Sequence, residues 1–405
     1  MSVVTARKSP QTRSKNVKPK VLAVSALLMT CLSGDLKGTP LLSWFPVDFT
    51  LFSGGLLLLL VIHHWIGRKF TLPPNFGYVV VVWLAFIPGV LVAVGSGNSL
   101  MKSMLLFTLT LLCAASPLII FSDDVTLGRW FIGLAVVATV VAPMLYLFPS
   151  VETGGNVGRL NLEGGTSITI ARVVAAGALV AVLVGLGSSL GRRLALWLLA
   201  AGLAIATVLI GSRGPFLALI AAVVVVVVAS PTFRQNRVGK ILGSAGLLSL
   251  LIVYVLSQSS VSAARLAGTL TGSGTDTARP FLYRTALDSI RTSPLGIGWG
   301  GYPHLPDIQL ASGSEVIYPH NLLLEVAAEG GWLAIATLLA VLFILFRKTL
   351  AKAADLPAAI ALGLATFWLV NAMFSSDVNG NRMWWASFGL LCVIAGRTDR
   401  GTVDG

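Results

Sequence analysis

The segment from Pro319 to Gly331, PHNLLLEVAAEGG, places a histidine at the start of an apolar helix. A titratable imidazole beside lipid is costly unless it has a function or is well hydrogen-bonded. His320 is therefore either a general base or a polar residue at the helix start that backbone groups satisfy. The next residue, Asn321, has a side chain that can cap the helix.

Two carboxylates follow on the same helix. Glu325 and Glu329 are four residues apart, so they share one helix face. They can orient the imidazole of His320 or pair with an arginine. The alternative is a structural ion pair that stabilises helix packing.

An arginine starts an upstream helix in the sequence GSRGP. Arg213 precedes Pro215, which is typical of the first turn of a helix. A guanidinium group together with the free amides of a helix start suits an oxyanion. The alternative is an arginine in a turn whose charged end extends to water.

Further arginines lie in ARPFLYR and in two weaker positions. Arg279 and Arg284 are five residues apart, so they do not share a helix face squarely and need not contact the same ligand. Each of them taken alone is more typical of a solvated charge. Arg159 and Arg172 are weaker candidates, and Arg172 lies within an apolar run where an unpaired charge is expensive.

The composition is that of a polytopic membrane protein. Of the 405 residues, 55% are hydrophobic and 11% are charged, and the mean hydropathy is +0.86. A soluble domain carries about 25% charged residues. The net charge of +13 fits basic cytoplasmic loops, so we expect no nucleic-acid partner. Three cysteines in apolar runs indicate small buried hydrophobes: Cys31, Cys113 and Cys392.

Apolar runs of membrane-spanning length recur along the whole chain and predict an all-α protein with about twelve transmembrane helices. We interpret the first run as a retained helix, although it could also be the apolar part of a signal peptide. The runs lie near 21–34, 48–66, 76–95, 101–120, 128–148, 168–188, 193–211, 214–230, 239–257, 320–346, 357–375 and 382–396.

The basic residues predict the topology. Lys and Arg cluster in the N-terminal tail, in alternate short loops and at the C-terminus, which favours both termini in the cytoplasm. The remaining basic residues lie outside, where an anionic ligand would explain them. The predicted divisions are a cytoplasmic tail (1–20), nine helices (21–257), an extracytoplasmic loop (258–319), three helices (320–396) and a cytoplasmic tail (397–405).

The long outer loop has internal order. Residues 280–290, PFLYRTALDSI, have helical spacing of apolar side chains and predict a short amphipathic helix at the outer membrane surface. The glycines of PLGIGWGGYP then predict a tight loop.

Three segments resemble the O-antigen ligase and polysaccharide polymerase superfamily: GSRGPFLAL, RPFLYRTALDSIRTSPLGIGWGGY and PHNLLLEVAAEGG. The resemblance extends from about residue 190 to residue 396. It implies a membrane glycosyltransferase of the GT-C type in the bacterial plasma membrane, with its active site on the extracytoplasmic face. The donor would be a glycan on undecaprenyl diphosphate, the acceptor a glycan or glycolipid, and membrane lipid would surround the protein.

The resemblance also implies residue roles. His320 matches the base that activates an acceptor hydroxyl, and Arg213 matches an arginine that holds the donor diphosphate. Either Arg279 or Arg284 matches the second arginine. If arginines neutralise the diphosphate, no metal cofactor is needed.

The choice between ligase and polymerase stays open. The sequence after Gly331 departs from the pattern of the ligases, and the paired Arg-x(10)-Gly loops of many polymerases are absent. A protein O-oligosaccharyltransferase would share the same site and differ in its acceptor. A small-solute transporter is a further alternative, which the scarcity of polar residues near the membrane midplane disfavours.

Overall fold

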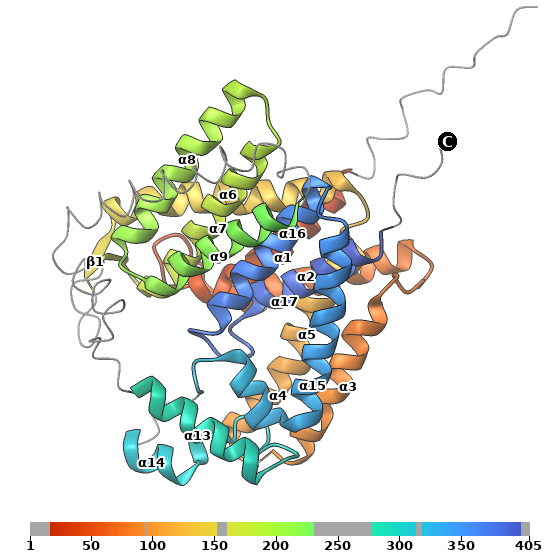
Figure 1. Ribbon diagram of the computed structural model, residues 1–405, viewed down its shortest axis with the longest axis vertical. Coiled ribbons are helices and arrows are strands. Elements are labelled where there is room, and N and C mark those ends of the chain that lie inside the picture. The colour runs from red at the N-terminus through yellow and green to blue at the C-terminus, as the bar shows by residue number, and fades with distance from the viewer. Residues whose placement is uncertain (1–16, 94, 152–159, 231–277, 313–317, 398–405) are drawn as a thin grey trace, which may run out of the picture.

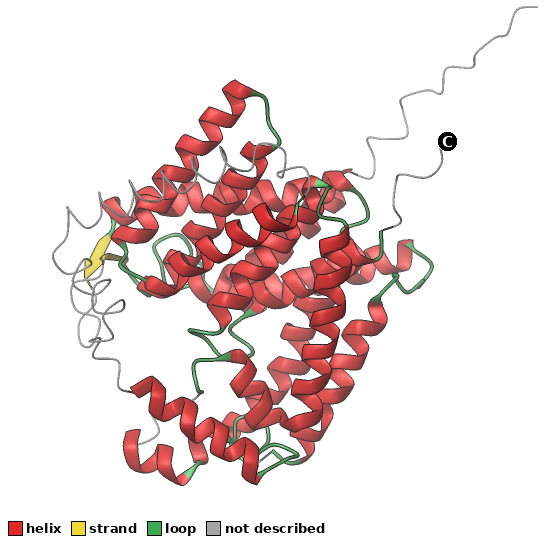
Figure 2. Ribbon diagram, viewed as in Figure 1, coloured by secondary structure: helices red, strands yellow, loops and turns green. Residues whose placement is uncertain are grey.

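The computed structural model describes residues 17–93, 95–151, 160–230, 278–312 and 318–397. In this part of the chain almost all regular structure is helical (Figures 1 and 2). The helices are α1 (Val17–Leu36), α2 (Phe49–Gly67), α3 (Phe76–Leu91), α4 (Gly97–Leu105), α5 (Leu111–Ile120), α6 (Asp124–Leu147), α7 (Ser167–Leu186), α8 (Leu190–Leu209), α9 (Arg213–Ala229), α13 (Ala278–Thr292), α14 (Pro306–Ser312), α15 (Leu322–Ala351), α16 (Leu356–Ala372) and α17 (Arg382–Ala395).

The described helices fit a multi-pass membrane protein. Six helical stretches are long and apolar enough to cross a membrane: Phe49–Gly67, Gly97–Ile120, Asp124–Leu147, Ser167–Leu186, Leu190–Leu209 and Leu322–Ala351. Four shorter apolar helices accompany them. Helices coincide with the predicted apolar runs wherever the structure describes the chain. The run predicted at 239–257 lies outside the described residues.

Helices α7 and α16 form the centre of the bundle. Most of their residues are buried, and many of these are alanine or glycine. Small side chains allow helix backbones to approach closely in a membrane protein. A Cβ atom at Gly363 of α16 would lie 2.9 Å from Leu183 of α7 and 3.0 Å from Val226 of α9. The central position of these two helices thus follows from their small residues.

Basic side chains from distant segments meet at one end of the bundle. Lys20 pairs with Asp123 at 2.7 Å, and Arg397 pairs with Asp124 at 2.6 Å. Because Asp123 caps the start of α6, both termini of the described chain reach this end. The turn between α16 and α17 lies at the opposite end, because Lys352 before α16 contacts the Ala395 carbonyl at the end of α17. The starts of α7 and α9 lie beside this turn, since Arg172 donates to Ser376 and a Cβ atom at Gly214 would lie 3.5 Å from Phe374.

The segments outside the bundle contain more structure than the sequence predicted. The amphipathic helix expected at 280–290 is present as α13, and α14 follows it. Both helices lie at the lower end of the view in Figure 1, where α13 contacts α15 and α14 lies against α13. Strands β1 (Pro149–Val151) and β2 (Leu160–Leu162) form a short antiparallel pair that was not predicted.

Candidate active site

His320 lies at a sharp turn directly before α15. Its φ angle is 57°, in the left-handed region that few residues other than glycine adopt. Asn321 caps the helix as predicted, because its side chain accepts hydrogen bonds from the amides of Leu323 and Leu324, both at 3.1 Å. The imidazole packs edge-on against the ring of Tyr318, with ring centroids 4.4 Å apart. The cap therefore fixes the backbone that carries the candidate base.

Glu325 and Glu329 pair with a lysine and not with an arginine. The Lys102 ammonium on α4 lies 2.6 Å from a carboxylate oxygen of each glutamate. Both glutamates are fully buried, and the lysine side chain is 10% exposed. Of the alternatives that the sequence left open, the ion pair that stabilises helix packing is therefore present, with a partner that the sequence did not indicate.

Helix α15 is broken at Gly331. The φ and ψ angles of this residue are 81° and −177°, a combination that is essentially restricted to glycine. The glycine-rich loop at 294–302 fills the break. The amide of Ile297 donates to the Ala328 carbonyl at 2.9 Å, and the amide of Trp332 donates to the Pro294 carbonyl at 2.9 Å. The predicted tight loop thus docks directly onto the helix that begins after His320.

The same loop binds the side chain of Glu329. The amides of Gly300 and Tyr302 donate to its two carboxylate oxygens at 3.0 and 3.3 Å. The Tyr302 hydroxyl in turn donates to the Leu282 carbonyl of α13 at 2.8 Å. Burial, and then the charge of Glu329, raise the pKa of the Tyr302 phenol, so it remains a neutral hydrogen-bond donor. Glu329 therefore connects α15 to the loop, and the loop connects to α13.

Arg172 holds the turn between α16 and α17. Its guanidinium donates to the Ser376 hydroxyl at 2.9 Å and to the carbonyls of Asn371 and Ser375 at 3.0 and 2.8 Å. The side chain is 2% exposed. This guanidinium group, a weaker candidate in the sequence, is thus largely engaged with protein oxygens.

The turn at 373–381 is the meeting point of the candidate segments. A Cβ atom at Gly214, the residue after Arg213, would lie 3.5 Å from Phe374, so α9 begins beside the turn. The Tyr283 hydroxyl of α13 donates to the Met373 carbonyl at 3.4 Å. The helix starts that carry Arg213 and Arg279 therefore converge on one turn.

Tyr318 links this turn to the start of α15. Burial, and then the negative charges of Asp377 and Glu325, raise the pKa of the Tyr318 phenol, while the positive charges of Arg172 and Lys102 oppose the shift. The phenol is thus within electrostatic reach of the turn and of the lysine, and its ring contacts the imidazole of His320. Histidine, turn and buried ion pairs form one polar region at this end of the bundle.

The two arginines of α13 differ in their surroundings. Arg279 is half-buried and lies one helical turn before Tyr283, whose hydroxyl contacts the turn. Arg284 is exposed. Arg159 lies outside the described residues. Of the pair that the sequence could not separate, Arg279 has the position closer to the meeting point.

Several residues of this region were not found from the sequence. Asn379 accepts a hydrogen bond from Thr110 at 2.8 Å and donates to the Lys102 carbonyl at 2.9 Å, so it joins the turn to α4 and to the π-helical segment Leu106–Thr110 that precedes α5. The polar run SSDVNGN between two apolar helices was the available signal. No group of three or more His, Cys, Asp or Glu side chains within the described ranges is arranged to hold a metal ion.

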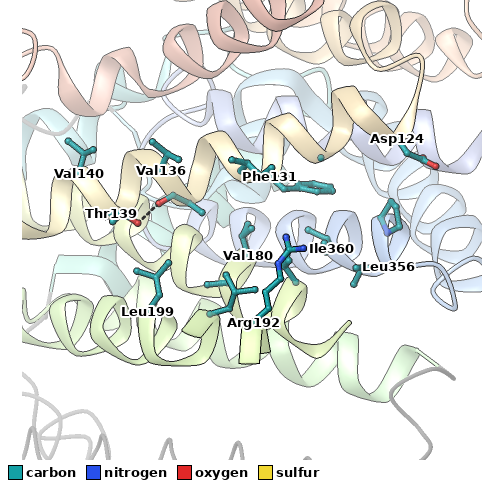
Figure 3. A pocket seen from close by; sticks show the side chains of 17 residues that line it. Asp124, Phe131, Val136, Thr139, Val140, Val180, Arg192, Leu199, Leu356 and Ile360 are labelled. Carbon is teal, nitrogen blue, oxygen red and sulfur yellow. Dashed lines mark hydrogen bonds between the residues drawn. The ribbon is translucent and has the colours of Figure 1, made fainter. Parts of the chain in front are cut away.

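An apolar groove lies away from this polar region. It has a volume of about 480 Å³ and is lined by α6, α7, α8 and the start of α16. Figure 3 shows aliphatic side chains along its walls, with Asp124 and Arg192 as its charged lining residues. It contains none of the candidate site residues.

The family comparison covers the central part of the site. Residues 194–339 match a family model described as O-antigen ligase, which confirms the resemblance seen in the sequence. The match includes Arg213, Arg279 and His320. Lys102, Arg172 and the turn at 373–381 lie outside it. No curated protein matches the chain.

Proposed function

Because the chain belongs to the O-antigen ligase and polysaccharide polymerase superfamily, we propose that it transfers an oligosaccharide from undecaprenyl diphosphate to a sugar hydroxyl. The family match supports a ligase-like glycosyltransferase in general. The observation that carries the proposal is the convergence of three segments on one turn. The ring of Tyr318 packs against His320 and lies within electrostatic reach of Asp377 in this turn, and the helix starts at Arg213 and Arg279 approach the turn through their neighbours.

The chemistry assigns a role to each residue. His320 accepts the proton of the acceptor hydroxyl as its oxygen attacks the anomeric carbon of the donor sugar. The bond from that carbon to the diphosphate oxygen breaks, and the electron pair leaves with the diphosphate. Arg213 and Arg279 stabilise the negative charge that grows on this leaving group, an effect of roughly 3–4 kcal/mol per donor in comparable oxyanion sites.

An assay with purified protein and a lipid-diphosphate oligosaccharide tests this assignment. We expect His320→Ala to abolish transfer. His63→Ala is the matched control, since His63 is exposed on α2 and is distant in sequence from the turn at 373–381. Normal product profiles with the His320→Ala protein would contradict the proposal. A ladder of products would indicate a polymerase, and a single transferred unit would indicate a ligase or, with a peptide acceptor, a protein O-oligosaccharyltransferase.

The same assay separates the two arginines of α13. We expect Arg279→Ala to lower the transfer rate by roughly 10²–10³-fold, as loss of one oxyanion donor does in other enzymes. Arg284→Ala should have little effect, because this side chain is exposed. The reverse order of effects would assign the diphosphate to Arg284. We also expect transfer to continue in excess chelator, and a loss that added Mg²⁺ restores would contradict the metal-independent mechanism.

We further propose that the site lies on the extracytoplasmic face of the bacterial plasma membrane. The basic side chains at the opposite end support a cytoplasmic location for both termini. A membrane-impermeant thiol reagent added to intact cells should label the Arg284→Cys protein and not the Lys348→Cys protein. The opposite labelling pattern would invert the topology.

A transporter is the second candidate, because α15 is discontinuous. Broken helices with buried charges form the substrate sites of many secondary transporters, and α15 is interrupted at Gly331 beside a buried ion pair. Solute uptake by vesicles that contain the protein and no glycan donor would favour this function. Transfer activity without uptake would exclude it.

A further inference from the structure

Lys102 occupies an unusual position among the described residues. It lies on α4, outside the family-matched segment, yet its ammonium contacts two carboxylates of α15 at 2.6 Å each. Both contacts are close ion pairs. One cation thus holds two anions at the centre of the polar region.

Stability alone is a weak explanation for this arrangement. Removing charges from water costs several kcal/mol per ion, and a buried ion pair often contributes no more stability than apolar residues of similar size. Here both glutamates are fully buried. The cluster is better explained by what its two carboxylates position.

The two glutamates belong to different parts of the site. Glu325 lies on the first turn of α15, and its amide donates to the Asn321 carbonyl at 2.9 Å, next to His320. Glu329 accepts the amides of Gly300 and Tyr302 in the glycine-rich loop. Lys102 therefore joins the helix start that carries His320 to the loop that fills the break in the helix.

We propose that Lys102 is a positioning residue that fixes the start of α15 and the glycine-rich loop in one frame, and so places His320 for transfer. Its effect on catalysis rests on the proposed function. Helix α4, which the family match does not include, then contributes to the site through this cation.

Lys102→Met tests the proposal, because methionine keeps an unbranched side chain as far as the ε position and removes the charge. We expect kcat per folded molecule to fall by about 10²-fold, as a displacement of about 1 Å does elsewhere, with the donor KM nearly unchanged. Hydrogen exchange at the amides of Gly300 and Tyr302 should become faster. The matched control is Lys37→Met, since Lys37 forms an exposed ion pair with Asp48 and should leave both readouts unchanged.

A second variant keeps the test decisive if Lys102→Met does not fold. Glu325→Gln leaves Lys102 paired with Glu329 in a neutral pair, so folding is expected to persist. It should lower kcat and leave exchange at the loop amides unchanged, because it releases the helix start alone. If every variant that folds keeps the wild-type kcat per folded molecule, the proposal is overturned and Lys102 has a role in stability only.

Failure of the proposed function has a different signature. If His320→Ala still transfers glycan, the proposed function is wrong whatever Lys102→Met does. The hydrogen-exchange measurement does not depend on activity, so it still reports whether Lys102 orders the loop. Unchanged exchange at Gly300 and Tyr302 in folded Lys102→Met protein would overturn the positioning role independently.

Discussion

The two ends of the central helices α7 and α16 lie in contrasting surroundings. At one end, Arg172 of α7 donates to the turn that follows α16, and the polar groups there are buried and largely bonded to one another. At the other end, the same two helices form the floor of an open, aliphatic groove (Figure 3). The groove has room and little polarity, whereas the turn has dense polarity among packed side chains.

This difference shows where chemistry is to be expected in a membrane protein. An apolar groove between spanning helices is solvated by lipid at little cost. Buried charges must be satisfied within the protein and are expensive, so they persist where they serve a function. The contrast therefore favours the turn at 373–381 as the reactive region, although the groove contains a cavity of about 480 Å³.

Glycine substitutions should give the largest difference between the two ends. A Cβ atom at Gly331 would lie 2.5 Å from the carbonyl carbon of Leu295 and 2.7 Å from the amide nitrogen of Gly296. With its left-handed φ, Gly331→Ala should cost about 4 kcal/mol or prevent folding. Gly128 lines the groove and has open space around the corresponding position, so Gly128→Ala should stabilise α6 by about 0.5–1 kcal/mol. Thermal unfolding in detergent measures both changes.

If Gly331→Ala and Gly128→Ala changed the stability equally, the polar end and the groove end would not differ in how tightly their backbones are packed. A stable Gly331→Ala protein would show in particular that α15 is not broken at this residue. Gly296→Ala is a second probe of the same contact, since a Cβ atom there would lie 2.7 Å from the amide nitrogen of Gly331. It should be as disruptive as Gly331→Ala.

Two arginines should differ by a smaller amount. Arg172→Met removes three hydrogen bonds, two of them to Ser375 and Ser376 in the turn at 373–381 and one to the Asn371 carbonyl at the end of α16. We expect a loss of about 3 kcal/mol. Arg192 is exposed at the groove, and Arg192→Met should change stability by no more than about 0.5 kcal/mol. Denaturation of the two variants in the same detergent is the measurement. Arg172→Met protein as stable as wild type would mean that the turn orders without this guanidinium.

The polar end and the groove end differ in how much of their structure the sequence predicts. Apolar runs gave the helices that line the groove, because hydropathy is a local property of the chain. The cap at Asn321 and helix α13 were also predicted from local signals. The pairing of Lys102 with Glu325 was missed, because it joins segments far apart in the sequence. The break at Gly331 was missed for a related reason, since the loop that fills it lies outside α15.

Two threonines allow a matched test on a finer scale. The Thr110 hydroxyl donates to the Asn379 side chain at 2.8 Å in a buried position, so Thr110→Val leaves an unpaired acceptor in the turn. We expect a loss of about 1–2 kcal/mol. The Thr139 hydroxyl donates to the Ala135 carbonyl within α6, at the exposed groove wall, and Thr139→Val should stay within about 0.5 kcal/mol of wild type. Similar losses in both variants, measured by thermal unfolding, would show that the turn is no more dependent on its hydrogen bonds than the groove.

The smallest expected effect lies at the groove end and depends on pH. Burial alone would raise the pKa of the Asp123 carboxyl, but hydrogen bonds from Lys20 and Thr126 outweigh it and lower this pKa to about 2. A carboxyl with a lowered pKa stabilises the fold above its unfolded pKa, and this contribution is lost as the pH falls toward the folded value. The melting temperature of wild type should therefore fall more than that of Asp123→Asn between pH 4 and about 2.

The side chain of Asp123 is 40% exposed, so water and salt screen its pair with Lys20 and the difference should be small. It should shrink further at high ionic strength. Parallel melting curves for the two proteins across this pH range would show that the pair contributes nothing measurable. A loss of stability as large as that for Arg172→Met would instead show that charges at the two ends are equally important. The contrast between the hydrogen-bonded polar end and the solvent-screened groove end would then be wrong.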